Sequence, residues 1–253
     1  MKNGRNSQRE PGNKSDSHIL DQAREVHEKS GLPMRWAMKV AKGEMPLAEA
    51  VKSLQKRDRI QRMVDNGELE QGHAASVLSG RSTLEEGLKA TRLRRRKRAE
   101  DYQKSHLQEL AGSATSVTLA LIGNRTVSGL VASHESFTIM LTDKDGQSVE
   151  IDKHDIKFFF FTQDRKRAVK SVQWGDPGQA LEPGALSTRK ERAKIKARVL
   201  LAAHEDGQMF RWATVEQDLL RGRVGWFGRF ELVLQTSRDV PIFVMRHAYS
   251  AME

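Results

Sequence analysis

The side chains in this sequence that are best suited to bind another molecule are cations. Between positions 92 and 98, six of seven residues are basic: Arg92, Arg94, Arg95, Arg96, Lys97 and Arg98. Arginine and lysine neutralise phosphates and release their counterions. A block of like charges also weakens a helix unless an anion compensates it. We therefore predict a phosphate-contacting basic helix within residues 91–112, with a solvated linker helix as the alternative.

Residue patterns typical of enzymes are missing. The sequence contains no His-Glu-x-x-His, no phosphate-binding Gly-Lys-Ser/Thr loop and no dinucleotide fingerprint. It has no cysteine, which excludes disulfides and thiolate metal sites. The triplet at 204–206, His-Glu-Asp, is better explained as a polar turn at a helix end than as a metal cluster. We predict no enzyme, no cofactor and no metal.

Composition narrows the class of partner. The 253 residues include 43 Lys and Arg against 33 Asp and Glu, a formal net charge of +10. Such a balance favours a polyanion, nucleic acid first, although ribosome-associated proteins share it. No apolar run approaches the roughly 18–20 residues of a membrane helix. Residues 1–16 are polar, lack a secretory apolar core and predict a disordered tail. We expect a cytoplasmic protein without membrane contact.

Residues 17–90 predict an all-α module with a two-fold internal repeat. The pattern Ala-x-x-Val-x-x-Gly-x-x-x-Leu-x-Glu starts at Ala37 and again at Ala74. Each copy describes a helix, a glycine turn and a second helix. Two interpretations remain open for this module, a docking role and a DNA-binding helix-turn-helix. The second is stronger for the first copy, whose second helix carries Lys52, Gln55, Lys56 and Arg57.

Residues 113–162 read as five short strands. Apolar side chains alternate at period two, and turn residues at Gly123-Asn124 and at 143–146 separate the runs. Gly129 interrupts the second strand, where a small barrel needs a sharp bend. This favours a small bent barrel. Residues 163–187 predict a linker, and 188–253 a helix followed by a similar, more divergent set of strands that begins with FRWATVEQ.

These strands carry a resemblance. The stretch TVSGLVASHESFTIML and the later Lys153-His154 resemble the glycine-centred strand, phenylalanine turn and lysine–histidine pair of the Sm-like RNA chaperone family Hfq. YQKSHLQEL, from position 102, resembles the family's N-terminal helix. Gly222, Phe230 and Arg246-His247 repeat the same order. The resemblance implies an α+β protein, with the helical module followed by two Sm-like five-stranded bent β-barrels.

The resemblance also implies an RNA site, in which aromatic rings stack bases and cations hold phosphates. Its residues are Gln103, Phe137, Lys153, His154, Arg229, Phe230, Arg246 and His247. Ser136, Asp152 and Ala120 depart from the family's pattern. We expect a non-catalytic RNA-binding protein, an Hfq-like chaperone or post-transcriptional regulator. The alternatives are an adaptor that docks on the ribosome or polymerase and a DNA-binding regulator.

The apolar run Phe158–Phe161 predicts assembly. It would be an aggregation-prone edge if left unpaired, so we expect it to pair between chains of a homo-oligomer or between the two barrels of one chain.

Overall fold

The computed structural model describes residues 14–188 and 195–252. The chain divides into two compact units, Met1–Thr91 and Arg92–Glu253, and each is described by itself. The predicted disordered tail lies outside the described residues as far as position 13, and the first helix begins at Lys14. Among the residues that are described, no helix combines the length and apolar character needed to cross a membrane.

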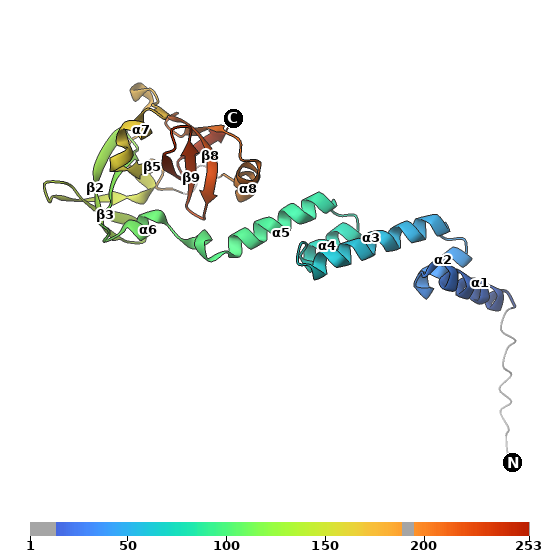
Figure 1. Cartoon of the computed structure of the whole chain (residues 1–253). Helices are drawn as coiled ribbons and strands as arrows, with labels where there is room; N and C mark the ends of the chain where they lie inside the picture. The colour runs from blue at the N-terminus through green and yellow to red at the C-terminus, as the bar shows by residue number, and fades with distance from the viewer. Residues whose placement is uncertain (1–13, 189–194, 253) are drawn as a thin grey trace, which may run out of the picture. The chain divides into compact units, whose positions relative to one another are not determined.

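The first unit is helical, as predicted (Figure 1). Its helices are α1 (Lys14–Ser30), α2 (Met34–Ala41), α3 (Leu47–Asp65), α4 (Gln71–Leu78) and α5 (Leu84–Arg98), of which α5 crosses the unit boundary. Gly43 and Gly80 end α2 and α4 with φ of 73° and 76°. Glycine adopts that left-handed conformation without strain. Each copy of the repeated pattern therefore forms a helix, a glycine turn and a second helix. A small core packs between α3, α4 and α5 around Ile60, Leu69, Ala74 and Val77.

The predicted basic helix is found through the whole basic run, but its expected continuation toward position 112 is wrong. Helix α5 stops at Arg98, and Ala99 is extended, with φ −59° and ψ 138°. A 3-10 turn, η1 (Glu100–Gln103), and the short helix α6 (His106–Leu110) follow. The break occurs because Arg96 is tied to Asp101 and to the carbonyl of Phe227, which turns the chain onto the sheet.

The second unit contains the strands. They are β1 (Ser116–Leu121), β2 (Arg125–His134), β3 (Thr138–Thr142), β4 (Ser148–Asp152), β5 (Ile156–Phe161), β6 (Val172–Gln173), β7 (Phe210–Thr214), β8 (Leu219–Phe227), β9 (Glu231–Thr236), β10 (Pro241–Met245) and β11 (Tyr249–Met252). Between them lie η2 (Lys153–Asp155), η3 (Thr162–Asp164), α7 (Arg165–Val169), η4 (Pro177–Gln179) and α8 (Ala197–Asp206). The predicted strand FRWATVEQ begins as expected at Phe210, but β7 ends at Thr214, three residues earlier than predicted.

The prediction of two separate small barrels is wrong. The strands form one 11-stranded antiparallel sheet in the order β11-β7-β8-β9-β10-β5-β1-β2-β3-β4, with β6 paired to β8. The joint is the pairing of β10 with β5, in which Phe243 lies opposite Phe159. The apolar edge strand predicted from Phe158–Phe161 is therefore covered within the same chain. Pairing this edge removes its open hydrogen-bonding groups and buries its phenylalanines.

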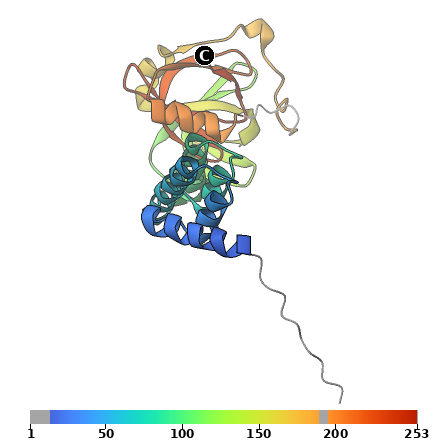
Figure 2. The ribbon, with the colours of Figure 1, turned by 90° about the vertical axis from the view of Figure 1, so that its right-hand side faces the viewer.

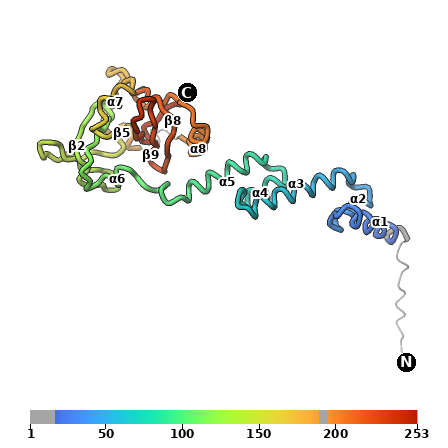
Figure 3. The backbone as a smooth tube through the Cα atoms, viewed as in Figure 1, coloured from blue at the N-terminus to red at the C-terminus, as the bar shows by residue number. Residues whose placement is uncertain are grey.

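The sheet nevertheless has an internal repeat. We call β1–β5 the first half and β7–β11 the second half, because the strand order β5-β1-β2-β3-β4 matches β11-β7-β8-β9-β10. A bulge between Val131 and Ser133 recurs between Val224 and Trp226, 93 positions later in the sequence. The backbone course of both halves can be followed in Figure 3. Gly129 and Gly222 have the same 93-residue separation, so the two halves align without insertions from this glycine onward.

Helix α8 and the chain before it complete the core. Leu200, Leu201 and Ala203 of α8 pack against Leu220 and Val224 of β8, and Figure 2 shows α8 lying along the strands of the second half. The predicted helix from Thr188 is found only from Ala197, and residues 189–194 lie outside the described residues. Residues 163–187, expected as a linker, fold onto the sheet through α7 and β6.

Candidate nucleic-acid interface

Two turns, one from each half, carry most of the residues predicted to bind RNA. In the first half, Lys153 donates its backbone N–H to the carbonyl of Phe137, with an N–O distance of 2.8 Å. In the second half, Arg246 donates in the same way to Phe230, at 2.9 Å. In the first half this bond joins the turn before β3 to the residues after β4. In the second half it joins the turn before β9 to the residues after β10. The repeat thus places an aromatic residue beside a basic pair twice.

These two arrangements of an aromatic residue beside a basic pair line one pocket of about 790 Å³. Seven of the eight residues predicted to form the RNA site lie in its wall: Phe137, Lys153, His154, Arg229, Phe230, Arg246 and His247. Leu107 and Gln108 of α6, with Met245 of β10, contribute to the same wall. The eighth residue, Gln103, is outside the wall but accepts a hydrogen bond from Arg229 (Nη1–Oε1 3.2 Å). The pairing of β5 with β10 brings the two copies together.

The aromatic rings are open to solvent. Phe137 is 68% exposed and Phe230 is 47% exposed, which is unusual for such large apolar side chains. The ring of His154 lies 6.2 Å from that of Phe137 and 5.6 Å from that of His247, so imidazoles stand between the two halves. The guanidinium of Arg229 lies 5.2 Å from the centre of the Phe230 ring. Flat rings with cations beside them form a surface on which bases can stack.

His154 is oriented by a neighbouring carboxylate. Asp152 accepts the backbone N–H of His154 at 2.8 Å and its ring Nδ1 at 2.9 Å. An ionised carboxylate only accepts hydrogen bonds, so Nδ1 carries the proton and Nε2 of the neutral ring is an acceptor. Asp152, one of the departures from the family's pattern, therefore caps η2 and fixes the tautomer of His154.

Lys153 and His134 both lie in the part of the pocket wall that the first half provides. Burial lowers the pKa of Lys153, although the nearby Glu135 carboxylate acts in the opposite direction. The ammonium group also donates to the carbonyl of Glu135. Burial and the positive charge of Lys153 lower the pKa of His134, which keeps this ring neutral near pH 7. A bound anion would favour the charged form of Lys153.

Arg246 supports the pocket from behind. Its Nη1 donates to the carbonyls of Gly228 (2.8 Å) and Arg229 (3.2 Å), and its Nη2 donates to Ile195 (2.7 Å). These bonds hold the turn that presents Arg229 and Phe230. Because its guanidinium already donates hydrogen bonds to three backbone carbonyls, Arg246 is a positioning residue in this structure.

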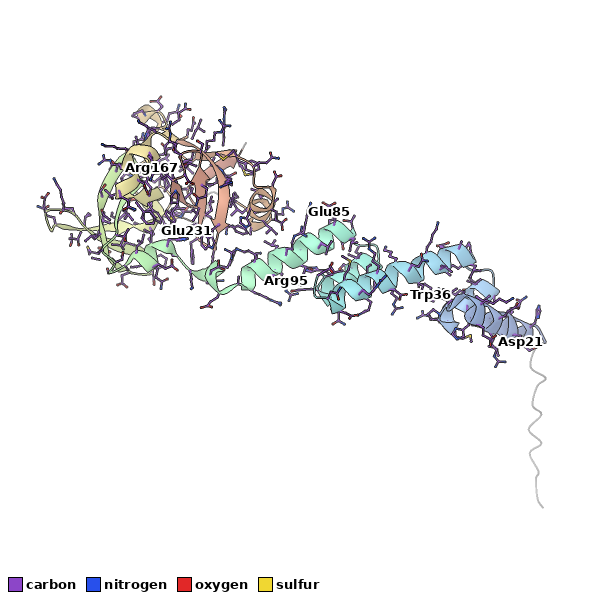
Figure 4. All side chains as sticks on the ribbon, viewed as in Figure 1. Asp21, Trp36, Glu85, Arg95, Arg167 and Glu231 are labelled. Atoms are coloured by element: carbon purple, nitrogen blue, oxygen red, sulfur yellow. The ribbon has the colours of Figure 1, made fainter. Side chains whose placement is uncertain are left out.

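The basic run has two kinds of members. Arg92 forms an ion pair with Glu205 at 2.6 Å, Arg96 is largely buried, and Arg94 and Arg98 also have interaction partners. Arg95, labelled on α5 in Figure 4, and Lys97 are exposed and make no hydrogen bond or ion pair with any residue in the described ranges. These two are the cations of the run that remain available to a phosphate.

Sequence reasoning missed two buried polar clusters. Glu231, at the start of β9 (Figure 4), is fully buried and accepts from the backbone and ring of His106 in α6. Lys157 in β5 is fully buried between Glu216 (2.5 Å) and Asp218 (2.6 Å). The available signal for the second cluster was a lysine inside the apolar strand IKFFFF. No sequence pattern pointed to its acidic partners.

Two comparisons with known proteins found no match. No protein-family model matches the chain, and no curated protein matches it.

Proposed function

We propose that this chain is a non-catalytic RNA-binding protein that takes a single-stranded segment into the pocket between the two halves. The observation that carries the proposal is the pocket wall itself. Two exposed phenylalanines, two histidines and the cations Lys153 and Arg229 reach it from turns far apart in the sequence. Stacking needs an unpaired base, so a single strand fits this wall better than a duplex.

Three kinds of contact would hold the strand. Phe137 and Phe230 stack bases, Lys153 and Arg229 bind phosphates, and Nε2 of His154 accepts a hydrogen bond from a base or a ribose hydroxyl. The net charge of +10 adds long-range attraction to the polyanion. The resemblance to the Sm-like RNA chaperones supports the same assignment, and we propose a role of that kind, in RNA chaperoning or post-transcriptional regulation in the cytoplasm.

The test removes the two rings. In the double variant Phe137→Ala/Phe230→Ala we expect affinity for a labelled single-stranded RNA of about 16 nucleotides to fall by about 1–3 kcal/mol per lost stacking contact. Fluorescence anisotropy at fixed salt measures it. Affinity for a hairpin duplex of equal length should change little, because its bases are already stacked.

Val149→Ala is the matched control, since Val149 is an apolar side chain of β4 that is 47% exposed and outside the pocket wall. Equal losses for single strand and duplex would reject stacking. Wild-type protein that binds duplex DNA or ribosomes but no single-stranded RNA would support the DNA-regulator or adaptor alternatives.

A further inference from the structure

A second cationic surface lies on the second half, outside the pocket wall. Arg211 of β7 and Arg221 of β8 are directly opposite each other in the antiparallel register, and Arg223 follows two positions along β8. We call these three residues the arginine strip. Side chains two apart on a strand share a face, and all three are exposed. The buried face of the same strands is formed by Trp212, Leu220 and Val224.

Among the described residues, no acidic side chain pairs with the arginine strip. The register partners of its members are each other and Gln235. Within residues 14–188 and 195–252, none of the three forms a hydrogen bond or an ion pair. Like charges directly opposite on neighbouring strands are destabilising. A pair placed in this way weakens the fold unless an anion binds it.

The first half provides an internal comparison. The positions 93 residues earlier are Thr118, Ser128 and Leu130, and Thr118 is registered opposite Ser128 just as Arg211 is opposite Arg221. The hydroxyls of Thr118 and Ser128 are hydrogen-bonded to each other at 2.8 Å. The fold therefore accepts a neutral, mutually satisfied pair at this place. The arginines of the second half are not a requirement of the strand pairing.

We propose that the arginine strip is a binding site for consecutive phosphate groups of a nucleic-acid strand. Guanidinium groups bind phosphate oxygens with two parallel hydrogen bonds and keep their charge at any physiological pH. Arg221 and Arg223 are about 6.6 Å apart along the strand, so they can contact different phosphates of one backbone. The three residues of the strip include no aromatic ring on which a base could stack. The site would therefore recognise the charge of the phosphates and not the identity of the bases. It rests on the proposed function only for the identity of the strand as RNA.

The test replaces the strip with neutral residues, Arg211→Thr/Arg221→Ser/Arg223→Gln, the first two of which restore the Thr–Ser pair of the first half. The control removes the same charge from three exposed turn residues, Lys144→Gln/Lys170→Gln/Arg238→Gln. Both variants and the wild type are titrated with single-stranded RNA and with inorganic polyphosphate, a phosphate chain without bases. Salt is varied from about 50 to about 200 mM.

Loss of three phosphate contacts should reduce the slope of log affinity against log salt by about 2, which is about a 20-fold difference across this salt range. Polyphosphate binding should weaken in parallel, and the control should change both by clearly less. The thermal midpoint of the strip variant should be equal to or above that of the wild type, because repulsion is relieved. A lower midpoint together with unchanged binding would show a structural role and overturn the proposal.

The two proposals fail in different ways. If the wild type binds RNA and the strip variant matches the charge control on both probes, the strip is rejected and the pocket stands. The wild type could instead bind polyphosphate but not RNA. If only the strip variant then loses polyphosphate binding, RNA binding is rejected and the phosphate site stands.

Discussion

Neighbouring arginines in this chain have two different roles, and the surroundings of each side chain decide which role it has. Arg96 has its guanidinium 5.3–5.8 Å from the ring centres of Tyr102, Trp226 and Phe227, and an ion pair with Asp101 at 2.6 Å. The hydrogen bonds from Arg96 and Trp226 lower the pKa of Asp101. Arg95, one residue earlier, is exposed and unpaired among the described residues. Adjacent arginines therefore have opposite roles.

The residue-scale prediction compares these two neighbours. Arg96→Gln removes the cation from an aromatic cage and should lower the free energy of unfolding by about 2 kcal/mol. Arg95→Gln should change it by less than about 0.5 kcal/mol, but should reduce the salt slope of RNA binding by about 0.7. Urea titration and binding titration measure the two quantities. Equal stability losses in both variants would contradict the assignment.

At the scale of elements, Gly129 of β2 and Gly222 of β8 hold matching places in the two halves but are not equally confined. A Cβ on Gly129 of β2 would lie 2.3 Å from the carbonyl oxygen of Thr142, whereas on Gly222 its nearest neighbours are at 3.0 and 3.1 Å. Real Cβ atoms do not approach backbone oxygen to 2.3 Å. The first half can therefore accept a side chain at Gly129 only if β2 and β3 separate.

We therefore expect Gly129→Ala to destabilise the protein by about 1–3 kcal/mol, the range typical of overpacking, and Gly222→Ala to cost less. Gly72→Ala in α4, where nothing lies within 4 Å, should be neutral or stabilising by up to about 1 kcal/mol. Chemical denaturation of the three variants tests this order. A larger loss at Gly222 than at Gly129 would show that the two glycines are not packed as described.

At the scale of the second unit, a buried charge cluster joins the two halves. Lys157 of the first half contacts Glu216 and Asp218 of the second half, and all three side chains are fully buried. Glu216 also accepts the backbone N–H groups of Gly123 and Leu181, both at 2.7 Å. Burial alone would raise the pKa of Glu216, but the Lys157 hydrogen bond and these donors outweigh it and lower the pKa.

The lowered pKa of Glu216 predicts how the stability of the fold changes with pH. A carboxyl whose pKa is lower in the folded state contributes stability that is present above its ordinary value of 4.5 and is lost as pH falls through the folded value. We expect Glu216→Gln to cost about 3–5 kcal/mol near pH 7, because it leaves a buried cation short of a partner. The gap between wild type and variant should narrow as pH falls below 4.5.

Urea unfolding at several pH values measures this gap. Glu182→Gln is the control, since Glu182 is an exposed carboxylate one residue after Leu181. A gap that stays constant from pH 7 to about pH 3 would show that ionisation of Glu216 does not hold the halves together.

Local patterns in the sequence determined most of the elements. Period-two alternation predicted the strands around Phe137, and the repeated glycine pattern at 43 and 80 predicted two helix-turn-helix units, because both signals depend only on near neighbours in the chain. The order Gly, Phe, Lys-His and its second copy also predicted which side chains would share a site, and seven of eight do so. That these residues bind RNA stays a prediction.

Tertiary structure alone decided how the halves combine and which cations remain available. Whether β5 pairs with β10 or with another chain depends on contacts about 85 positions apart, and no local pattern encodes that choice. The same holds for Arg96 and Arg246, whose guanidinium groups are bound by carbonyls and rings from distant segments, while Arg95 and the arginine strip remain unpaired in the described structure. Sequence states the charge of a side chain, but only the folded chain determines what neutralises it.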